Sequence, residues 1–290
     1  MLGCFFSFAL LNSHLIGAPD LMAQYKQLER DWAPIEKPTE NLDPRALIGF
    51  SLEATALKWH PERVAYALTV LEQMQDRDTT SKTYGNFRWY MWQPKPIDLN
   101  AVEFTMQQAI LLWNLYGSSL DKKSRDRLEK LINLSVDGIK SHPVSVSYTN
   151  IYVMKTWNLI AIGEAFKRDD IAHEGYAMLQ NWMDYTYHNG IQEYLSPTYY
   201  SVDINSLSLL NKFAKQQQDR ESAQKALQLI YWQCRANWFA PNERLSGWLQ
   251  CLVLQLLWRT SLCRPPSGAS TGLPQFSSRS ALRGCRLAGK

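Results

Sequence analysis

The strongest constraint on the fold is a series of helical segments in which more apolar and more charged segments alternate. Their apolar residues recur at the spacing of one helix face, and Asp43 before Pro44 is a typical helix start. The only alternating run typical of a strand is Val144–Tyr148, which predicts one short extended stretch. The expected helices are Pro44–Trp59, Pro61–Gln75, Asn100–Tyr116, Asp121–Lys140, Thr149–Phe166, Asp169–Tyr187, Val202–Lys215 and Arg220–Asn237.

The alternation predicts an all-α fold with two layers of helices. Thr149–Phe166 is apolar on nearly every side, which indicates an inner helix. Paired helices of this kind build either an open solenoid or a closed α/α toroid. A tetratricopeptide array would repeat about every 34 residues, and no fixed period is present. We therefore expect antiparallel helical hairpins that form an incomplete α/α toroid.

Charge and composition divide the chain into three parts. We expect an N-terminal segment at 1–43, a partial toroid domain at 44–247 and a basic tail at 248–290. From Arg244 onward there are six Arg, one Lys and no acidic residue, so the net charge of +4 comes from the C-terminal end. The tail is either a basic interaction tail or a non-native reading frame joined to a truncated domain, and its abrupt change of composition favours the second.

The remaining composition limits cofactors, partners and localisation. The five cysteines form no CxxC unit, so neither a zinc site nor a disulfide framework is predicted, and we expect no cofactor. The body of the chain carries no basic stripe for nucleic acid, and no apolar run is long enough to span a membrane. The apolar N-terminus indicates a packed helix rather than a secretory signal at residues 1–23, which favours a cytoplasmic protein over a secreted one.

Two expected connections between helices are rich in aromatic residues with polar groups between them. The first spans 85–103 and contains Arg88, Trp89, Trp92 and Asp98. Flat aromatic faces beside carboxylates and amides suit sugar rings, because C–H faces stack on the ring while hydroxyl groups hydrogen-bond. These four residues are therefore candidate substrate-binding residues. The alternative is that the aromatic rings fill gaps between helix ends.

The second connection, 188–203, is denser in polar and aromatic residues. Glu193 is a candidate general acid or base, and the alternative role is to accept backbone N–H bonds that hold the loop. His188 is a candidate base or a cation at a helix C-terminus. The other candidates here are Tyr199 and Tyr200 for catalysis and Tyr194 and Asp203 for substrate binding. Asn150, near the start of an inner helix, would face a central cavity.

Three stretches resemble the α/α-toroid proteins of the heparinase and alginate-lyase type, many of which carry only a hypothetical label. They are DLNAVEF (98–104), SYTNIYVMKTWNLIAIGE (147–164) and NGIQEYLSPTYYSVD (189–203). The resemblance covers roughly residues 44–247 and implies a glycan groove and β-elimination of a uronate polysaccharide. It implies Tyr199 or Tyr200 as acid/base, His188 as base, Asn150 as the group that neutralises the carboxylate, and Arg88 as a carboxylate clamp. Such proteins continue beyond Gly247, so the ring is expected to be truncated.

Three functions are compatible with these residues. The first is a polysaccharide lyase, which requires a groove that joins the tyrosines, His188 and Asn150. The second is an inverting glycoside hydrolase, which requires two carboxylates about 6.5–9.5 Å apart, and Glu193 with Asp98 or Asp203 would be the pair. The third is a non-catalytic helical binding protein, in which Trp89, Trp92, Tyr199 and Tyr200 would be buried.

Overall fold

The structure is a computed structural model that describes residues 20–193, 196–239 and 244–245. The expectations for the N-terminal helix within residues 1–18, for Tyr194 and for the 248–290 tail lie outside these residues. The helices are α2 (Leu21–Glu36), α3 (Pro44–Ala56), α4 (Pro61–Met74), α5 (Ala101–Tyr116), η1 (Gly117–Ser119), α6 (Lys122–Ser141), α7 (Thr149–Phe166), α8 (Asp169–Asn189), α9 (Pro197–Phe213) and α10 (Gln217–Ala236). Two short antiparallel strands follow, β1 (Trp238–Phe239) and β2 (Arg244–Leu245).

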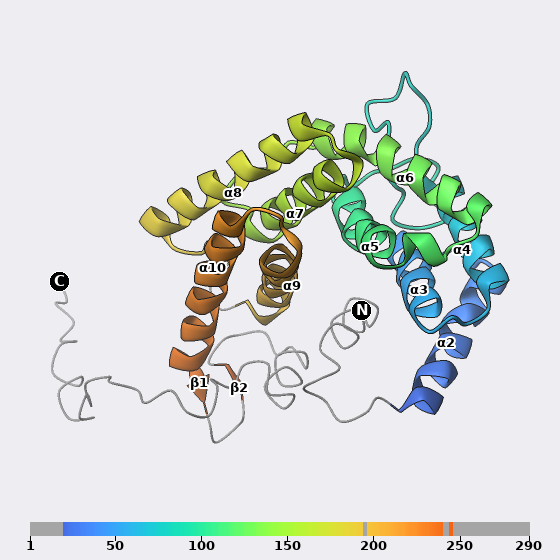
Figure 1. The fold of residues 1–290 in the computed structure, drawn as a ribbon, viewed down its shortest axis with the longest axis horizontal. Helices are drawn as coiled ribbons and strands as arrows, with labels where there is room; N and C mark the ends of the chain where they lie inside the picture. Colours follow the sequence, from blue (N-terminus) through green and yellow to red (C-terminus); the bar gives the residue numbers. More distant parts are fainter. Residues whose placement is uncertain (1–19, 194–195, 240–243, 246–290) are drawn as a thin grey trace, which may run out of the picture.

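The fold is all-α, as predicted, and its helices form two layers along a curved arc (Figure 1). Helices α3, α5, α7 and α9 pack side by side in the inner layer, and each packs against its hairpin partner in the outer layer, α4, α6, α8 and α10. Helix α7 is buried along its first fifteen residues, from Thr149 to Gly163, which confirms the inner position predicted from its apolar sequence.

Helix boundaries follow local capping signals where these are present. The Asp43 carboxylate accepts the backbone N–H of Ala46 at 3.0 Å, which confirms Asp43 as the cap of α3. Gly190 ends α8 with a φ of 72°, a conformation that suits glycine, as predicted.

Two expectations about elements were wrong, and one helix was not predicted. Helix α9 begins at Pro197 rather than Val202, because proline is well suited to the first helical position, so Tyr199 and Tyr200 lie on a helix and not on a loop. Val144–Tyr148 forms no strand but a loop with a turn. Helix α2 was not predicted, and it packs on α3 through Leu28, Trp32 and Ile35.

The long connection between α4 and α5 is held firmly against the outer layer. Gly85 has a φ of 82°, and its backbone touches α6 so closely that a Cβ on Gly138 would lie 2.7 Å from the Gly85 carbonyl carbon. The buried Gln75 amide donates to the carbonyls of Gly85 and Leu131 and to the Ser135 hydroxyl. These contacts fix where the connection leaves the helices.

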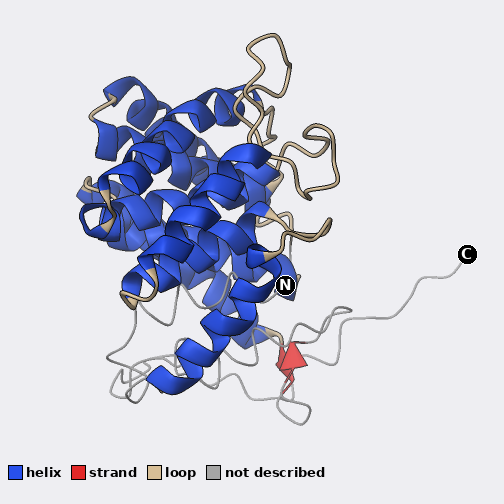
Figure 2. Ribbon diagram, turned by 90° about the vertical axis from the view of Figure 1, so that its right-hand side faces the viewer, coloured by secondary structure: helices blue, strands red, loops and turns tan. Residues whose placement is uncertain are grey.

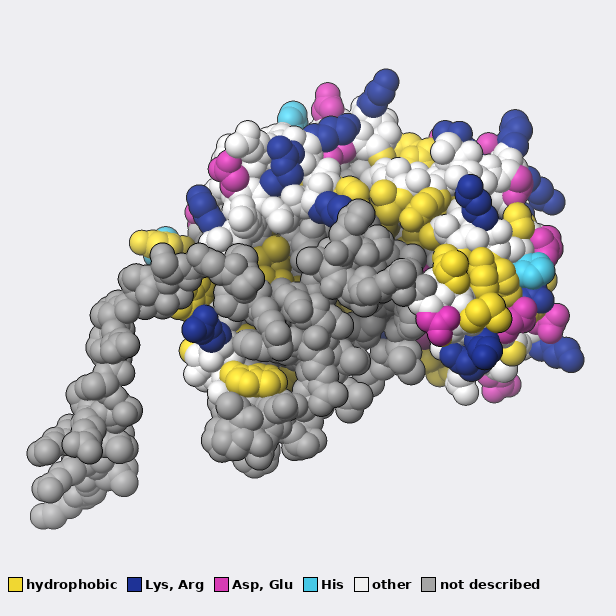
Figure 3. All heavy atoms as spheres, turned by 60° about the horizontal axis from the view of Figure 1, so that its bottom comes forward, with side chains coloured by type: hydrophobic (Ala, Val, Ile, Leu, Met, Phe, Trp, Pro, Cys, Tyr) yellow, Lys and Arg dark blue, Asp and Glu magenta, His cyan; other side chains and the backbone are white. Residues whose placement is uncertain are grey.

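Among the described helices, none combines the length and the apolarity that crossing a membrane requires. On the part of the surface in Figure 3 that belongs to described residues, Lys and Arg side chains lie among Asp and Glu side chains.

Candidate functional site

The arrangement of the hairpins gathers three connections at one end of the inner layer. Each outer helix ends where the next inner helix begins, so the α4–α5, α6–α7 and α8–α9 connections lie at the N-termini of α5, α7 and α9. Figure 2 shows the longer loops emerging together on one side of the helical stack. Both aromatic connections singled out in the sequence therefore belong to the same end of the fold.

Glu193 lies at the N-terminus of α7. Its Oε2 accepts the backbone N–H of Asn150 at 2.9 Å, and Tyr148, the cap residue of α7, provides no side-chain cap. The carboxyl thus satisfies one of the open N–H groups at the start of a helix from another segment of the chain. Burial raises the pKa of the half-buried Glu193 to about 7, although the Asn150 hydrogen bond lowers it in part.

Asp203 is a second carboxyl group beside Glu193. It lies on α9 with no exposed surface, and neither of its carboxyl oxygens has a hydrogen-bond partner among the described residues. Burial raises its pKa well above the ordinary value, and the negative charge of Glu193 raises it further. Burial and the charge of Glu193 therefore both favour the neutral form of the Asp203 carboxyl.

Tyr148 joins the two connections at this end of the fold. Asn100 donates its side-chain amide to the Tyr148 hydroxyl at 3.3 Å, and the Asp98 carboxylate accepts the Asn100 backbone N–H at 2.9 Å. Burial raises the pKa of Tyr148, and Tyr199, Asp98 and Glu193 lie close enough for their charges to raise it too. Tyr148 and Tyr199 each keep about 40% of their surface exposed, at 40% and 42%.

We call this group the carboxyl–tyrosine cluster. Its members share the N-terminal ends of three inner helices. They are Asp98, Asn100, Tyr148, Asn150, Glu193, Tyr199 and Asp203.

The cluster can exchange protons near neutral pH. A carboxyl with a pKa of about 7 serves as a general acid or base in that range. Asp98 is exposed, so the two carboxyl groups nearest the solvent, Glu193 and Asp98, stand in different environments.

Two sequence-predicted catalytic residues do not join the cluster. Tyr200 is fully buried, and its hydroxyl donates to the Gln233 side chain at 2.5 Å. His188 is exposed on the last turn of α8, and its Nδ1 lies 2.8 Å from the Asp184 carbonyl. Asn150 does lie in the cluster, but its side chain is buried and its Oδ1 has no hydrogen-bond partner among the described residues.

Arg88 holds the α4–α5 connection in place through hydrogen bonds to backbone carbonyl groups. Its guanidinium donates to the backbone carbonyls of Gln73 and Gln93 at 2.8 Å each and to that of Met91 at 3.3 Å. With these bonds formed, the structure gives Arg88 a positioning role in the connection rather than the place of a carboxylate clamp.

The two tryptophans of this connection differ in how far they are packed against the rest of the protein. Trp89 packs against Phe104 with ring centroids 5.6 Å apart, and the Arg45 guanidinium lies 4.8 Å from its ring centroid. Trp92 is 54% exposed and lies nearly parallel to Tyr90. Trp89 is therefore largely structural, whereas Trp92 faces the solvent.

A buried ionic group lies behind the cluster and was missed in the sequence. Glu103 on α5 is fully buried, with Oε1 3.0 Å from Nδ1 of the buried His142. Lys155 on α7 donates to the His142 carbonyl at 2.7 Å, and the Asn158 amide donates to the Glu103 carbonyl at 2.9 Å. Burial raises the pKa of Glu103, while His142 and Lys155 lower it in part. No local sequence pattern indicates this group, because its members come from the start of α5, the end of α6 and the middle of α7.

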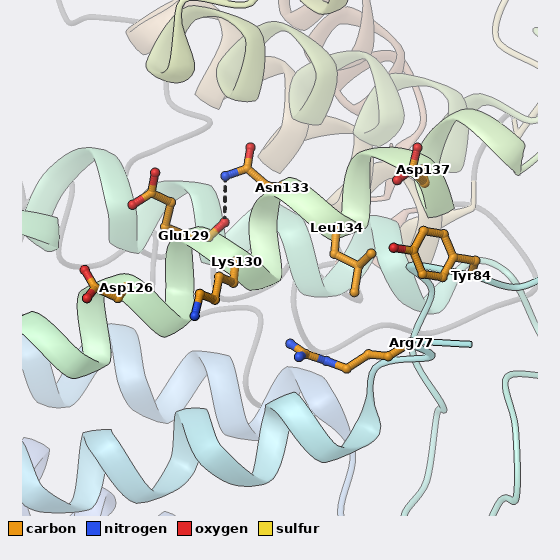
Figure 4. A pocket seen from close by; sticks show the side chains of 8 residues that line it. All are labelled: Arg77, Tyr84, Asp126, Glu129, Lys130, Asn133, Leu134 and Asp137. Atoms are coloured by element: carbon orange, nitrogen blue, oxygen red, sulfur yellow. Dashed lines mark hydrogen bonds between the residues drawn. The ribbon is translucent and has the colours of Figure 1, made fainter. Parts of the chain in front are cut away.

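A cavity lies elsewhere, between α6 and the segment that follows α4 (Figure 4). In Figure 4, Arg77 and Tyr84 face α6, and Asn133 donates to the Glu129 carbonyl at 3.0 Å. No member of the carboxyl–tyrosine cluster lines this cavity. Within the residues that the structure describes, no three His, Cys, Asp or Glu side chains are grouped so that they could hold a metal ion.

The family model of a domain of unknown function (DUF8769) matches residues 62–247. The match covers well over half of the chain, so the chain belongs to this family. It includes every member of the carboxyl–tyrosine cluster. No curated protein and no solved structure matches the chain.

Proposed function

We propose that this chain is a carbohydrate-active protein of incomplete α/α-toroid architecture, and that Glu193 transfers the proton when a glycan is cleaved. The observation that carries the proposal is the half-buried Glu193 carboxyl, with a pKa of about 7, beside the half-exposed rings of Tyr148 and Tyr199. Tyrosine faces beside carboxyl and amide groups provide the stacking and hydrogen bonding that a sugar ring needs.

Hydrolysis is the reaction that this arrangement favours. Glu193, which a pKa of about 7 leaves partly protonated at neutral pH, would donate its proton to the glycosidic oxygen as the bond from that oxygen to the anomeric carbon breaks. The exposed Asp98 carboxylate would take a proton from water as the water oxygen bonds to the same carbon. Asp203, which is fully buried and whose neutral form is favoured by burial, would act as a positioning residue beside Glu193.

Elimination from a uronate glycan is the second candidate. The observation that favours it is the Tyr148 phenol, which lies close enough to Tyr199 and to Glu193 for their charges to raise its pKa. In that reaction a base removes the proton next to the uronate carboxylate, and the leaving oxygen takes a proton as its carbon–oxygen bond breaks. The assignments of His188 as base and of Arg88 as clamp lose support, because His188 contacts its own helix and Arg88 contacts backbone carbonyls.

A purely non-catalytic binding protein is less well supported. That function predicts that Trp89, Trp92, Tyr199 and Tyr200 are all buried. Tyr200 is buried, but Trp92 and Tyr199 are exposed at 54% and 42%.

The test is turnover of a panel of neutral and uronate-containing polysaccharides, read as reducing ends and as the ultraviolet absorbance of unsaturated uronates. We expect reducing ends without that absorbance, with activity falling as the pH rises above about 7, because Glu193 must hold its proton. Glu193→Gln should lower the rate by about 100-fold or more, whereas the exposed control Glu129→Gln should not. Absorbance that depends on Glu193 would establish elimination instead. Full activity of Glu193→Gln would remove Glu193 from the mechanism.

A further inference from the structure

We propose that Tyr90 and Trp92 form a second sugar-binding subsite, so that the chain takes an extended glycan rather than a terminal sugar. The link to catalysis rests on the proposed function of Glu193. The subsite itself is argued from the geometry of the connection between α4 and α5.

The two rings form an exposed, nearly parallel pair. Their centroids are 6.4 Å apart, and their planes differ by 9°. Tyr90 is 37% exposed and Trp92 is 54% exposed. Rings in one orientation present their faces to neighbouring units of one chain of sugars, which stack through their C–H faces.

The backbone that carries the two rings is held in place before any ligand binds. The N–H groups of Met91 and Trp92 donate to the carbonyls of Leu42 and Glu40, at 3.1 and 3.2 Å, which ties the connection to the α2–α3 loop. Exposed aromatic rings on a fixed backbone lose little conformational freedom on binding, which favours affinity.

The interior of the connection is equally well bonded. The buried Gln93 side chain accepts the N–H groups of Trp89 and Tyr90 at 2.8 and 3.2 Å. The Arg88 guanidinium donates to three backbone carbonyls on the same side of the fold. These bonds orient Tyr90 and Trp92 without using any atom of their side chains.

The subsite lies on the same connection as Asp98 and Asn100, two members of the carboxyl–tyrosine cluster. Trp92 and Asp98 are six positions apart, and Pro94 and Pro96 between them favour an extended backbone. The two points are therefore at most about 20 Å apart. One oligosaccharide can span that distance, which is why the subsite predicts a polymeric substrate.

The area argues for a glycan rather than a protein partner. A fully buried aromatic side chain accounts for about 150–250 Å², and both rings here are partly covered already. A stable protein interface needs about 800 Å² on each partner. Two rings suit a few sugar units and fall far short of such an interface.

The test compares Trp92→Ala and Tyr90→Ala with wild type on oligosaccharides of increasing length, drawn from each glycan in the panel. Trp232→Ala is the matched control, since Trp232 is 57% exposed on α10. Binding is measured by calorimetry, and KM and kcat are measured where turnover occurs. Helix content measured by circular dichroism checks that each variant is folded.

We expect the affinity of wild type to rise with the length of the oligosaccharide. Trp92→Ala should lose about tenfold in affinity for long oligosaccharides only, with KM raised and kcat unchanged. An equal effect at all lengths, no effect, or no glycan binding by wild type would overturn the subsite. If Glu193→Gln stays active while Trp92→Ala shows the length dependence, the proposed function fails and the subsite stands. If Glu193→Gln is inactive and Trp92→Ala matches wild type, the subsite fails and the proposed function stands.

Discussion

Glu193 should lower the stability of the fold at neutral pH, and Glu193→Gln should recover it. Gln keeps the size of the side chain and an oxygen that accepts the Asn150 N–H, but it cannot ionise. Burial raises the Glu193 pKa from 4.5 to about 7. The folded protein therefore binds this proton more tightly than the unfolded chain does. The stability that it contributes is fully present below pH 4.5 and is lost as the pH rises through about 7.

The size of the effect follows from that pKa. At about 1.4 kcal/mol per pKa unit, the full difference would be about 3 kcal/mol. Because the carboxyl is only half-buried, solvent screens its charge, and we expect about 1–2 kcal/mol. Asp203 is retained in the variant, and the loss of the neighbouring charge acts in the same direction.

Urea unfolding between pH 4 and pH 8.5 measures this difference directly. Taking pH 4 as the reference, the free energy of unfolding of Glu193→Gln should exceed that of wild type by about 1–2 kcal/mol at pH 8.5. Glu129→Gln, at an exposed position, should show no such trend. A difference that is independent of pH, or one that grows as the pH falls, would refute the argued burial of Glu193.

Two further predictions concern the scaffold. Gly138→Ala should lower the free energy of unfolding by about 1–3 kcal/mol, because its Cβ would lie 2.7 Å from the backbone of Gly85. Gly117→Ala is the control and should leave the free energy of unfolding unchanged, because the nearest atom to its Cβ would be 3.7 Å away. Equal unfolding curves for the two variants would contradict the close approach at Gly138. Glu103→Ala should lower the free energy of unfolding in urea by about 3–5 kcal/mol, because it leaves the buried His142 side chain without its carboxyl partner. The double variant with His142→Ala should lose less than the sum of the single variants, and strict additivity would show that the two side chains do not interact.

The helical hairpins were largely predictable because their signals are local. Asp43 before Pro44 starts α3, Gly190 ends α8, and the apolar sequence of α7 indicates burial on all sides. The start of α9 was predicted wrongly for a reason that is also local. The polar and aromatic residues from Pro197 to Val202 have no apolar periodicity, and the helix start signalled by proline was outweighed.

The candidate site was predictable only in parts. The sequence indicated that residues 85–103 and 188–203 carry aromatic and carboxyl groups suited to a sugar. It could not indicate that Glu193 bonds to Asn150, or that Tyr148 lies between Asn100 and Glu193. These residues are 40 or more positions apart, and no local pattern relates them.

Periodicity, caps and turns arise from interactions between near neighbours in the chain. The amino-acid sequence alone therefore indicates most of the helices, their pairing into hairpins and the kinds of side chain in each connection. Only the packing of α5, α7 and α9 side by side brings their N-termini together. That packing also removes water from Glu193 and Asp203, and desolvation is what raises their pKa values. The chemistry of the site is therefore a property of the tertiary structure, because both contact and desolvation depend on segments far apart in the sequence.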